Sequence, residues 1–184
     1  MKETRESWII KGYETFALDG ENGLKIEKLA KEVGISKSSF YHHFADIVVF
    51  TENLLFHHLE KAKIIAEKEK RAKTINPELI NILIDHKIDL LFNRQLRINA
   101  NNPNFKKTLH KSNEIIGKDF IELWLTDAKI SLTKPQVEGL FELALENFYL
   151  QINPENIEKN WLESYFENLN RIIKSFGGPL YGSD

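Results

Sequence analysis

The chain has 184 residues, 42% of them hydrophobic, with a formal net charge of −2 at pH 7. This length allows one large domain or a small domain and a larger one, and the few glycines and prolines (9 and 5) argue against a β-rich or disordered protein. The absence of cysteine excludes disulfides and cysteine metal ligands, and the charged N-terminus, with no apolar run near about 18 residues, predicts a cytoplasmic protein without signal peptide or membrane span.

The N-terminal part predicts three short helices. Apolar residues fall on one stripe of a helix over residues 3–19, which a Gly20–Gly23 loop ends. A second apolar face recurs with helical spacing at Ile26, Leu29, Ala30 and Val33. Gly34 follows where a helix C-terminus favours a residue that tolerates positive φ, and Ser36 is placed to cap the third helix with its side chain.

The third helix has an apolar side and a polar side. Phe40 and Phe44, four residues apart, are its anchors, and its other residues are polar: Lys37, Ser38, Ser39, Tyr41, His42 and His43. Two helices joined by a short glycine turn, the second with a polar outer face, form the helix-turn-helix pattern. The pattern predicts that this helix enters the major groove of DNA.

The remainder of the chain is also predicted to be helical. Asp46 is placed to cap a long fourth helix, and further helices are expected over residues 77–92, 104–126, 134–151 and 154–176. Asn76 and Asn153 each precede a proline and are predicted to open their helices. No strand is predicted, so the fold class is all-α, with about nine helices.

The head of the chain resembles the TetR/AcrR family of transcriptional repressors. The resemblance rests on Gly20, on Leu29–Ala30 and on the run from Val33 to Phe44, and it covers about residues 6–55. It implies a helix-turn-helix DNA-binding domain at residues 1–46 and a helical effector-binding and dimerisation domain at residues 47–184.

The function that the resemblance implies is DNA-binding transcriptional regulation. A homodimer would place its two third helices on a palindromic double-stranded operator, and a small-molecule effector in the C-terminal domain would change their spacing, as in a ligand-responsive repressor. The last two helices would pair across the dimer. The sequence carries no phosphate-binding loop and no nucleophile motif, so neither enzymatic activity nor a cofactor is expected.

The family's DNA-contacting positions fall on residues at the two helices of the motif: Lys25, Ser36, Lys37, Ser38, Ser39, Tyr41, His42 and His43. Lys37 can reach a phosphate or a guanine edge, and the Tyr41 hydroxyl a phosphate. His43 is equally compatible with a structural place in the bundle. Lys25 stands where the family commonly has a capping Ser or Thr, and Ile47 where it often has a phosphate-binding lysine.

The charge of this region is modest. Four lysines against two glutamates in residues 22–44 give a local charge of +2. Together with Ile47, this leaves an alternative function open: a helical small-molecule-binding or protein-interaction module with a degraded DNA-binding head.

Two further sets of residues are predicted in the C-terminal part. The effector pocket is expected to be lined by polar and aromatic side chains, at His58, His86, Trp124 and Phe148. The dimer interface is expected to use an aromatic stripe, with Phe141, Phe148, Trp161, Tyr165, Phe166, Leu169 and Ile173. Adjacent histidines on a helix point about 100° apart, and no metal-ligand motif is present, so no metal site is predicted.

Overall fold

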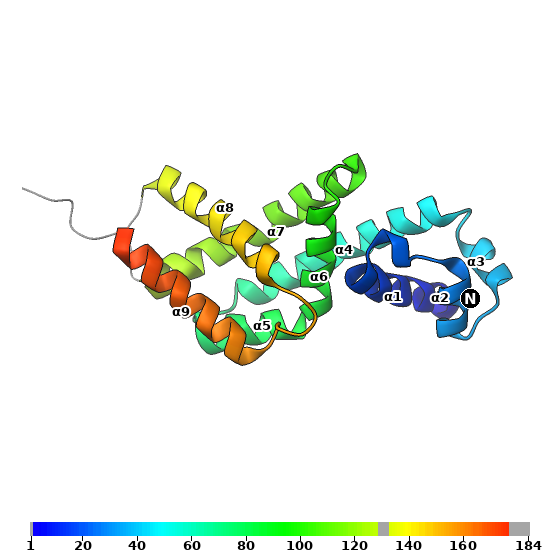
Figure 1. Cartoon of the computed structure of the whole chain (residues 1–184), viewed down its shortest axis with the longest axis horizontal. Helices are drawn as coiled ribbons and strands as arrows, with labels where there is room; N and C mark the ends of the chain where they lie inside the picture. The colour runs from blue at the N-terminus through cyan, green and yellow to red at the C-terminus, as the bar shows by residue number, and fades with distance from the viewer. Residues whose placement is uncertain (1, 129–132, 177–184) are drawn as a thin grey trace, which may run out of the picture. The chain divides into compact units, whose positions relative to one another are not determined.

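The computed structural model describes residues 2–128 and 133–176, without the side chains of 2, 3, 117–120, 122, 126–128, 134, 173, 175 and 176. Its described residues form helices and no strand, which confirms the all-α prediction. The α-helices, shown in Figure 1, are α1 (Lys2–Asp19), α2 (Ile26–Val33), α3 (Lys37–His43), α4 (Ile47–Glu69), α5 (Ile80–Asp85), α6 (Lys87–Ile98), α7 (Pro103–Ala128), α8 (Lys134–Gln151) and α9 (Lys159–Phe176). A 3-10 turn spans Glu21–Gly23 and a π-helical turn Ile75–Leu79.

The helices pack as two compact units. The head unit comprises Met1–Ile64 and Ile88–Ile115, and the second unit comprises Ile65–Lys87 and Ile116–Asp184. The helices α4 and α7 each contribute residues to both units. The functional division between residues 46 and 47 stays a prediction.

The core of the head unit is aromatic. Tyr13 stacks on Phe92 of α6 with ring centroids 4.3 Å apart, and Phe16 meets Phe92 at 4.4 Å and Phe105 of α7 at 5.4 Å. All four side chains are buried. A three-helix unit of this size has marginal stability on its own. These contacts stabilise α1 by packing it against α6 and α7.

The turn between α2 and α3 is set by Gly34. Its backbone is left-handed, with φ 75° and ψ 24°, and the amides of Gly34 and Ile35 both donate to the Ala30 carbonyl, at 3.0 and 3.1 Å. A Cβ at this position would meet no atom within 4 Å. Glycine is favoured here by its backbone conformation, because a left-handed L-residue costs roughly 1–2 kcal/mol.

Two predicted caps have different outcomes. Asp46 caps α4 as predicted, its Oδ1 accepting from the Val49 amide at 2.8 Å. Ser36 stands at the N-cap position of α3 but makes no side-chain cap bond. Its Oγ lies 2.9 Å from the Oγ of Ser38 instead, so the predicted side-chain cap is wrong.

The single helix predicted over residues 77–92 is also wrong. Asn76 has an extended backbone (φ −114°, ψ 119°) and is followed by a cis peptide bond to Pro77, and the helix breaks again at His86. The apolar residues of this segment serve two cores: Leu79, Ile80 and Leu83 are buried in the second unit, and Leu90, Leu91 and Phe92 in the head unit. One straight helix would present them to one core.

The second unit contains α8 and α9 side by side (Figure 1). The helix α8 begins at Lys134 as predicted, and the amide and hydroxyl of Thr133 before it both donate to Gln136 Oε1. The predicted start of α9 at Pro154 is wrong by five residues, since α9 begins at Lys159. Asn153 Oδ1 accepts from the amides of Glu155 and Asn156, which closes a turn ahead of the helix.

Candidate nucleic-acid interface

The α3 helix is fixed by its buried face. Phe40 and Phe44 are 0% and 1% exposed. The Phe40 ring lies 5.3 Å from Trp8 of α1 and 5.2 Å from Phe50 of α4, and the Phe44 ring lies 4.8 Å from Phe50. Edge-to-face aromatic contacts of this kind are directional. They therefore fix the rotation of α3 as well as its position.

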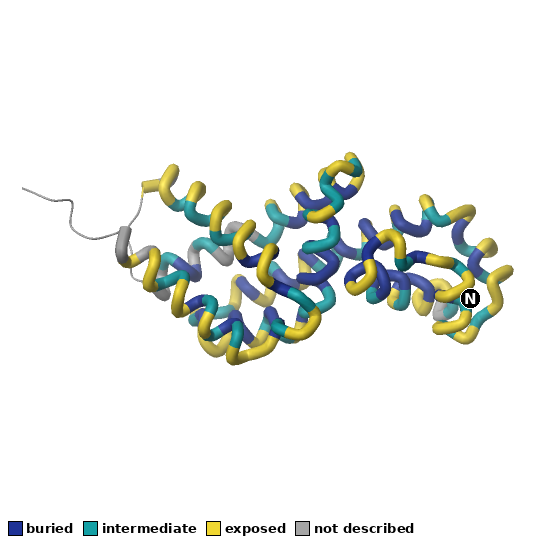
Figure 2. The backbone as a smooth tube through the Cα atoms, in the orientation of Figure 1, coloured by how far each residue is buried: buried dark blue, intermediate teal, exposed yellow. Residues whose placement is uncertain are grey.

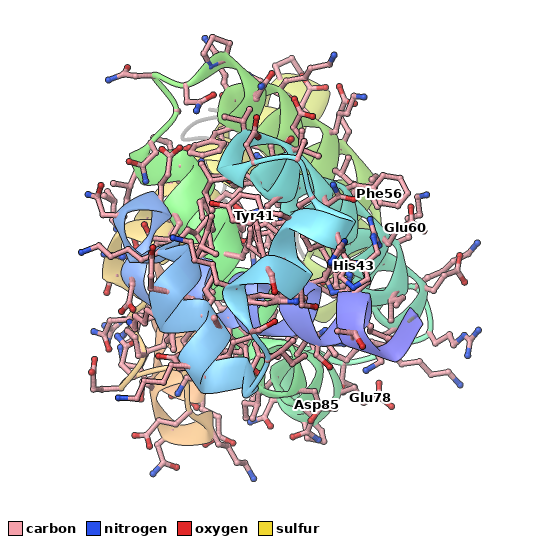
Figure 3. All side chains as sticks on the ribbon, turned by 90° about the vertical axis from the view of Figure 1, so that its right-hand side faces the viewer. Tyr41, His43, Phe56, Glu60, Glu78 and Asp85 are labelled. Atoms are coloured by element: carbon pink, nitrogen blue, oxygen red, sulfur yellow. The ribbon has the colours of Figure 1, made fainter. Side chains whose placement is uncertain are left out.

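The opposite face of α3 is open to solvent. Ser36, Lys37, Ser38, Tyr41 and His42 are exposed, and Ser39 and His43 are partly buried. Figure 3 views the molecule from this side and labels Tyr41 and His43. The small serines at the start of α3 allow close approach of a second surface, and the long side chains supply donors around them. The structure thus brings the predicted α3 residues together on one short helix.

Tyr41 and His43 differ in their surroundings. Tyr41 is 50% exposed, and its ring meets Phe40 edge-on at 5.5 Å. The His43 ring lies 6.2 Å from the Phe44 ring and is partly covered. Tyr41 is therefore the more exposed of the two residues.

The lysines around α3 are held by acidic partners. The Lys37 ammonium forms an ion pair with Glu27 of α2, and Lys28 Nζ lies 2.9 Å from Asp19 of α1. The hydrogen bond from Lys37 is the main cause that lowers the pKa of Glu27, and the reciprocal bond raises the pKa of Lys37. Lys25 stands exposed at the N-cap position of α2 with no side-chain cap bond.

Arg5 is a cation of this region that the sequence analysis missed. Its guanidinium lies 5.4 Å from the centroid of the Phe44 ring and donates to Asn53 Oδ1 of α4. It bridges α1 and α4 beside the end of α3. A basic residue one turn ahead of the buried Trp8 was the available signal. Nearby, Ile47 is partly buried, and Val48 is 60% exposed.

His58, a predicted effector contact, lies in a buried polar network of the head unit. The Tyr13 hydroxyl donates to Asp89 Oδ1 at 2.8 Å and lies 2.8 Å from His58 Nδ1. Because this hydroxyl has one proton, the His58 Nδ1–H must be the donor to its oxygen. The three residues join α1, α4 and α6 and are at most 6% exposed.

The protonation of His58 is set by this burial. Desolvation lowers its pKa to about 4, against an opposing contribution from Asp89. The ring stacks on Phe92 at 4.7 Å, and among the described residues its Nε2 has no hydrogen-bond partner. His58 is thus a neutral core histidine at pH 7.

The other predicted effector contacts belong to the second unit. Lys68 Nζ lies 2.8 Å from His86 Nε2, and Trp124 Nε1 donates to Asn170 Oδ1 of α9 at 3.1 Å. Phe148 is 8% exposed and contacts the aromatic rings of α9. All three are buried, and their role in effector binding stays a prediction.

The predicted interface stripe on α8 and α9 packs in part within its own unit. Trp161 and Tyr165 stack at 5.4 Å, and Tyr165 donates to the Ala144 carbonyl at 2.9 Å; burial raises the pKa of Tyr165 to about 12. Phe166 is 4% exposed. Phe141 and Leu169 are partly buried, and the side chain of Ile173 lies outside the described residues.

More exposed apolar side chains lie on the same two helices. Leu143 and Leu150 of α8 are 70% and 78% exposed, and Ile172 of α9 is 52% exposed. Figure 2 shows exposed positions recurring along α8. The spacing of Leu143 and Leu150, two helical turns apart, places them on one face. These aliphatic residues lie outside the predicted stripe, which was defined by its aromatic side chains.

Metal sites and membrane-spanning helices are both absent from the described ranges. No group of three or more His, Asp or Glu side chains is arranged to hold a metal ion there. In the same ranges, no helix combines the length and apolarity that a membrane span requires.

The fold and the α3 face together define a helix-turn-helix DNA-binding protein. Residues 9–47 match the family model for bacterial regulatory proteins of the tetR family. The match covers the helix-turn-helix part of the chain and includes the Gly20-to-Phe44 motif on which the predicted resemblance rests.

Two solved structures have the same fold. A chain from Mesorhizobium loti MAFF303099, named as a TetR-family transcriptional regulator, superposes with a TM-score of 0.61 at 16% identity, over 95% of this chain and 96% of that one. A second chain with the same kind of name, from a Rhodococcus species, superposes with a TM-score of 0.57 at 18% identity, over 97% of this chain and 100% of that one. A comparison with curated protein sequences gives no significant match.

Proposed function

We propose that the protein is a repressor that binds a palindromic operator as a homodimer through α3. The observation that carries the proposal is the α3 face, where Lys37 and Tyr41 flank small serines on a helix fixed by the Trp8, Phe40 and Phe50 rings. A rigid helix with small residues at its start fits a major groove about 12 Å wide. Phosphate contacts from Lys25, His42 and Arg5 would fix its register. Such a protein acts in the cytoplasm, where the chromosome lies.

The homodimer is proposed to form through α8 and α9 of two copies. Leu143, Leu150 and Ile172 are more than half exposed, and large exposed apolar side chains of this kind favour a protein partner. A second copy is the partner that a two-fold symmetric operator requires, because each protomer carries one α3.

The effector is proposed to bind in the second unit. This unit buries His86, whose Nε2 lies 2.8 Å from Lys68 Nζ, and it also buries Trp124 and Phe148. A mixed apolar and polar lining is the usual composition of small-molecule sites. Effector binding is proposed to release the operator.

The test is a selection of DNA fragments from the genome that encodes the protein, with the purified full chain. We expect enrichment of one sequence with two-fold symmetry, its half-sites about one helical turn apart or a multiple of this. Repeating the selection with candidate effectors should reduce the enrichment. A single unrepeated half-site would contradict the homodimer. Tight ligand binding without any selected DNA would favour the alternative module with a degraded head.

A further inference from the structure

The ion pair between Lys37 and Glu27 links the two helices of the DNA-binding motif. Glu27 lies in the first turn of α2, and Lys37 is the first residue of α3, so the pair spans the turn at Gly34. Both side chains are solvent-exposed, at 48% for Lys37 and 71% for Glu27. Lys37 is the one lysine or arginine of α3.

We propose that Glu27 restrains DNA binding by competing with the DNA phosphates for Lys37. The inference rests on the proposed function, since it concerns the same face of α3. A phosphate can contact the Lys37 ammonium fully only after Glu27 has released it. The released carboxylate then stands at the start of α2, close to the same polyanion. Both effects lower the affinity of the protein for DNA, whatever the DNA sequence.

The salt dependence of binding would carry the signature of this exchange. A lysine that is free in solution displaces about one condensed cation when it binds a phosphate, which steepens the slope of log K against log salt by about 0.9. In the free protein, Lys37 is paired with Glu27. A Lys37 side chain that stays with Glu27 displaces no condensed cation from random-sequence DNA, so the wild-type slope lacks this contribution.

A matched control is available on the same helix. Glu32 of α2 pairs with Lys11 of α1 at 3.3 Å and does not contact Lys37. Replacing either glutamate by glutamine removes one negative charge from α2. In the Glu32→Gln variant, Lys11 retains Glu14 at 3.6 Å. Only the Glu27→Gln variant therefore leaves an α3 lysine without its acidic partner.

The experiment measures binding of the full chain to a random-sequence DNA duplex over a series of salt concentrations. We expect Glu27→Gln to bind about three- to tenfold more tightly than wild type at low salt and to steepen the slope by about 0.9 for each protomer that binds the duplex. Glu32→Gln should leave the slope at the wild-type value. Equal slopes for Glu27→Gln and wild type, or equal changes in both variants, would overturn the proposal.

A double variant separates the exchange from a general effect of charge. In the Glu27→Gln background, Lys37→Gln should return the slope to the wild-type value, because no released lysine remains. Persistence of the steeper slope in the double variant would also overturn the proposal. Failure of all these proteins to bind DNA at low salt would refute the proposed function itself, and the inference with it.

Discussion

Replacing Phe40 by alanine is expected to lower the free energy of unfolding of the head unit by about 3–5 kcal/mol and to abolish DNA binding. Phe40 is 0% exposed, and its ring contacts Trp8, Phe44 and Phe50. The truncation would leave a cavity where three helices meet, and α3 would lose the contacts that fix its rotation. Urea unfolding followed by circular dichroism, with hydrogen exchange at the α3 amides, measures the effect.

The control for Phe40→Ala is Phe56→Ala on α4. Phe56 is 66% exposed and is labelled in Figure 3, so the same chemical truncation removes little buried contact. Its expected effect on unfolding lies within about 0.5 kcal/mol. An unfolding midpoint for Phe40→Ala equal to that of Phe56→Ala would contradict the aromatic support of α3.

The head unit is also expected to lose stability in mild acid through His58. Burial lowers the pKa of His58 in the folded state from 6.5 to about 4, so the unfolded chain binds more protons between these values. The contribution of neutral His58 to the free energy of unfolding is therefore fully present above about pH 6.5, and it decreases as the pH falls toward 4. The loss amounts to about 3 kcal/mol, since one pKa unit corresponds to about 1.4 kcal/mol.

The comparison that isolates His58 is the difference between wild type and His58→Gln. Other groups with lowered pKa values, such as Glu27 and Glu78, are present in both proteins. Unfolding in urea at a series of pH values should show a weaker pH dependence in His58→Gln. Replacing the exposed His110 by glutamine serves as a control. A pH profile unchanged by His58→Gln would contradict the assigned protonation state.

The helix-turn-helix was predictable because its signals are local. The apolar spacing of α2, the left-handed position at Gly34 and the Phe40–Phe44 pair all lie within about two dozen consecutive residues. The predicted motif agrees with the structure, and of the predicted outer face of α3, Lys37, Ser38, Tyr41 and His42 are exposed while Ser39 and His43 are partly buried. The helical spacing of apolar residues and the glycine turn both lie in this short segment, so they predict the same structure.

Other features were missed because residues distant in the chain decide them. The break at His86 arises because neighbouring apolar residues serve two different cores, a competition that periodicity does not record. The Tyr13–His58–Asp89 network joins residues 45 and 76 positions apart in the chain. The Lys37–Glu27 pair depends on the geometry of the turn between two helices. None of these features can be recognised from the pattern of neighbouring residues in the sequence.

Titration of the selected operator with α3 variants tests most directly whether this helix binds the DNA. We expect Lys37→Ala and Tyr41→Phe each to weaken operator binding by about tenfold, as the loss of one good DNA contact would. The control is Lys106→Ala, which removes the same charge from an exposed position on α7 and should change the affinity less than about twofold. Unchanged operator affinity in both α3 variants, with folding intact, would contradict the assignment of α3 as the DNA-binding helix.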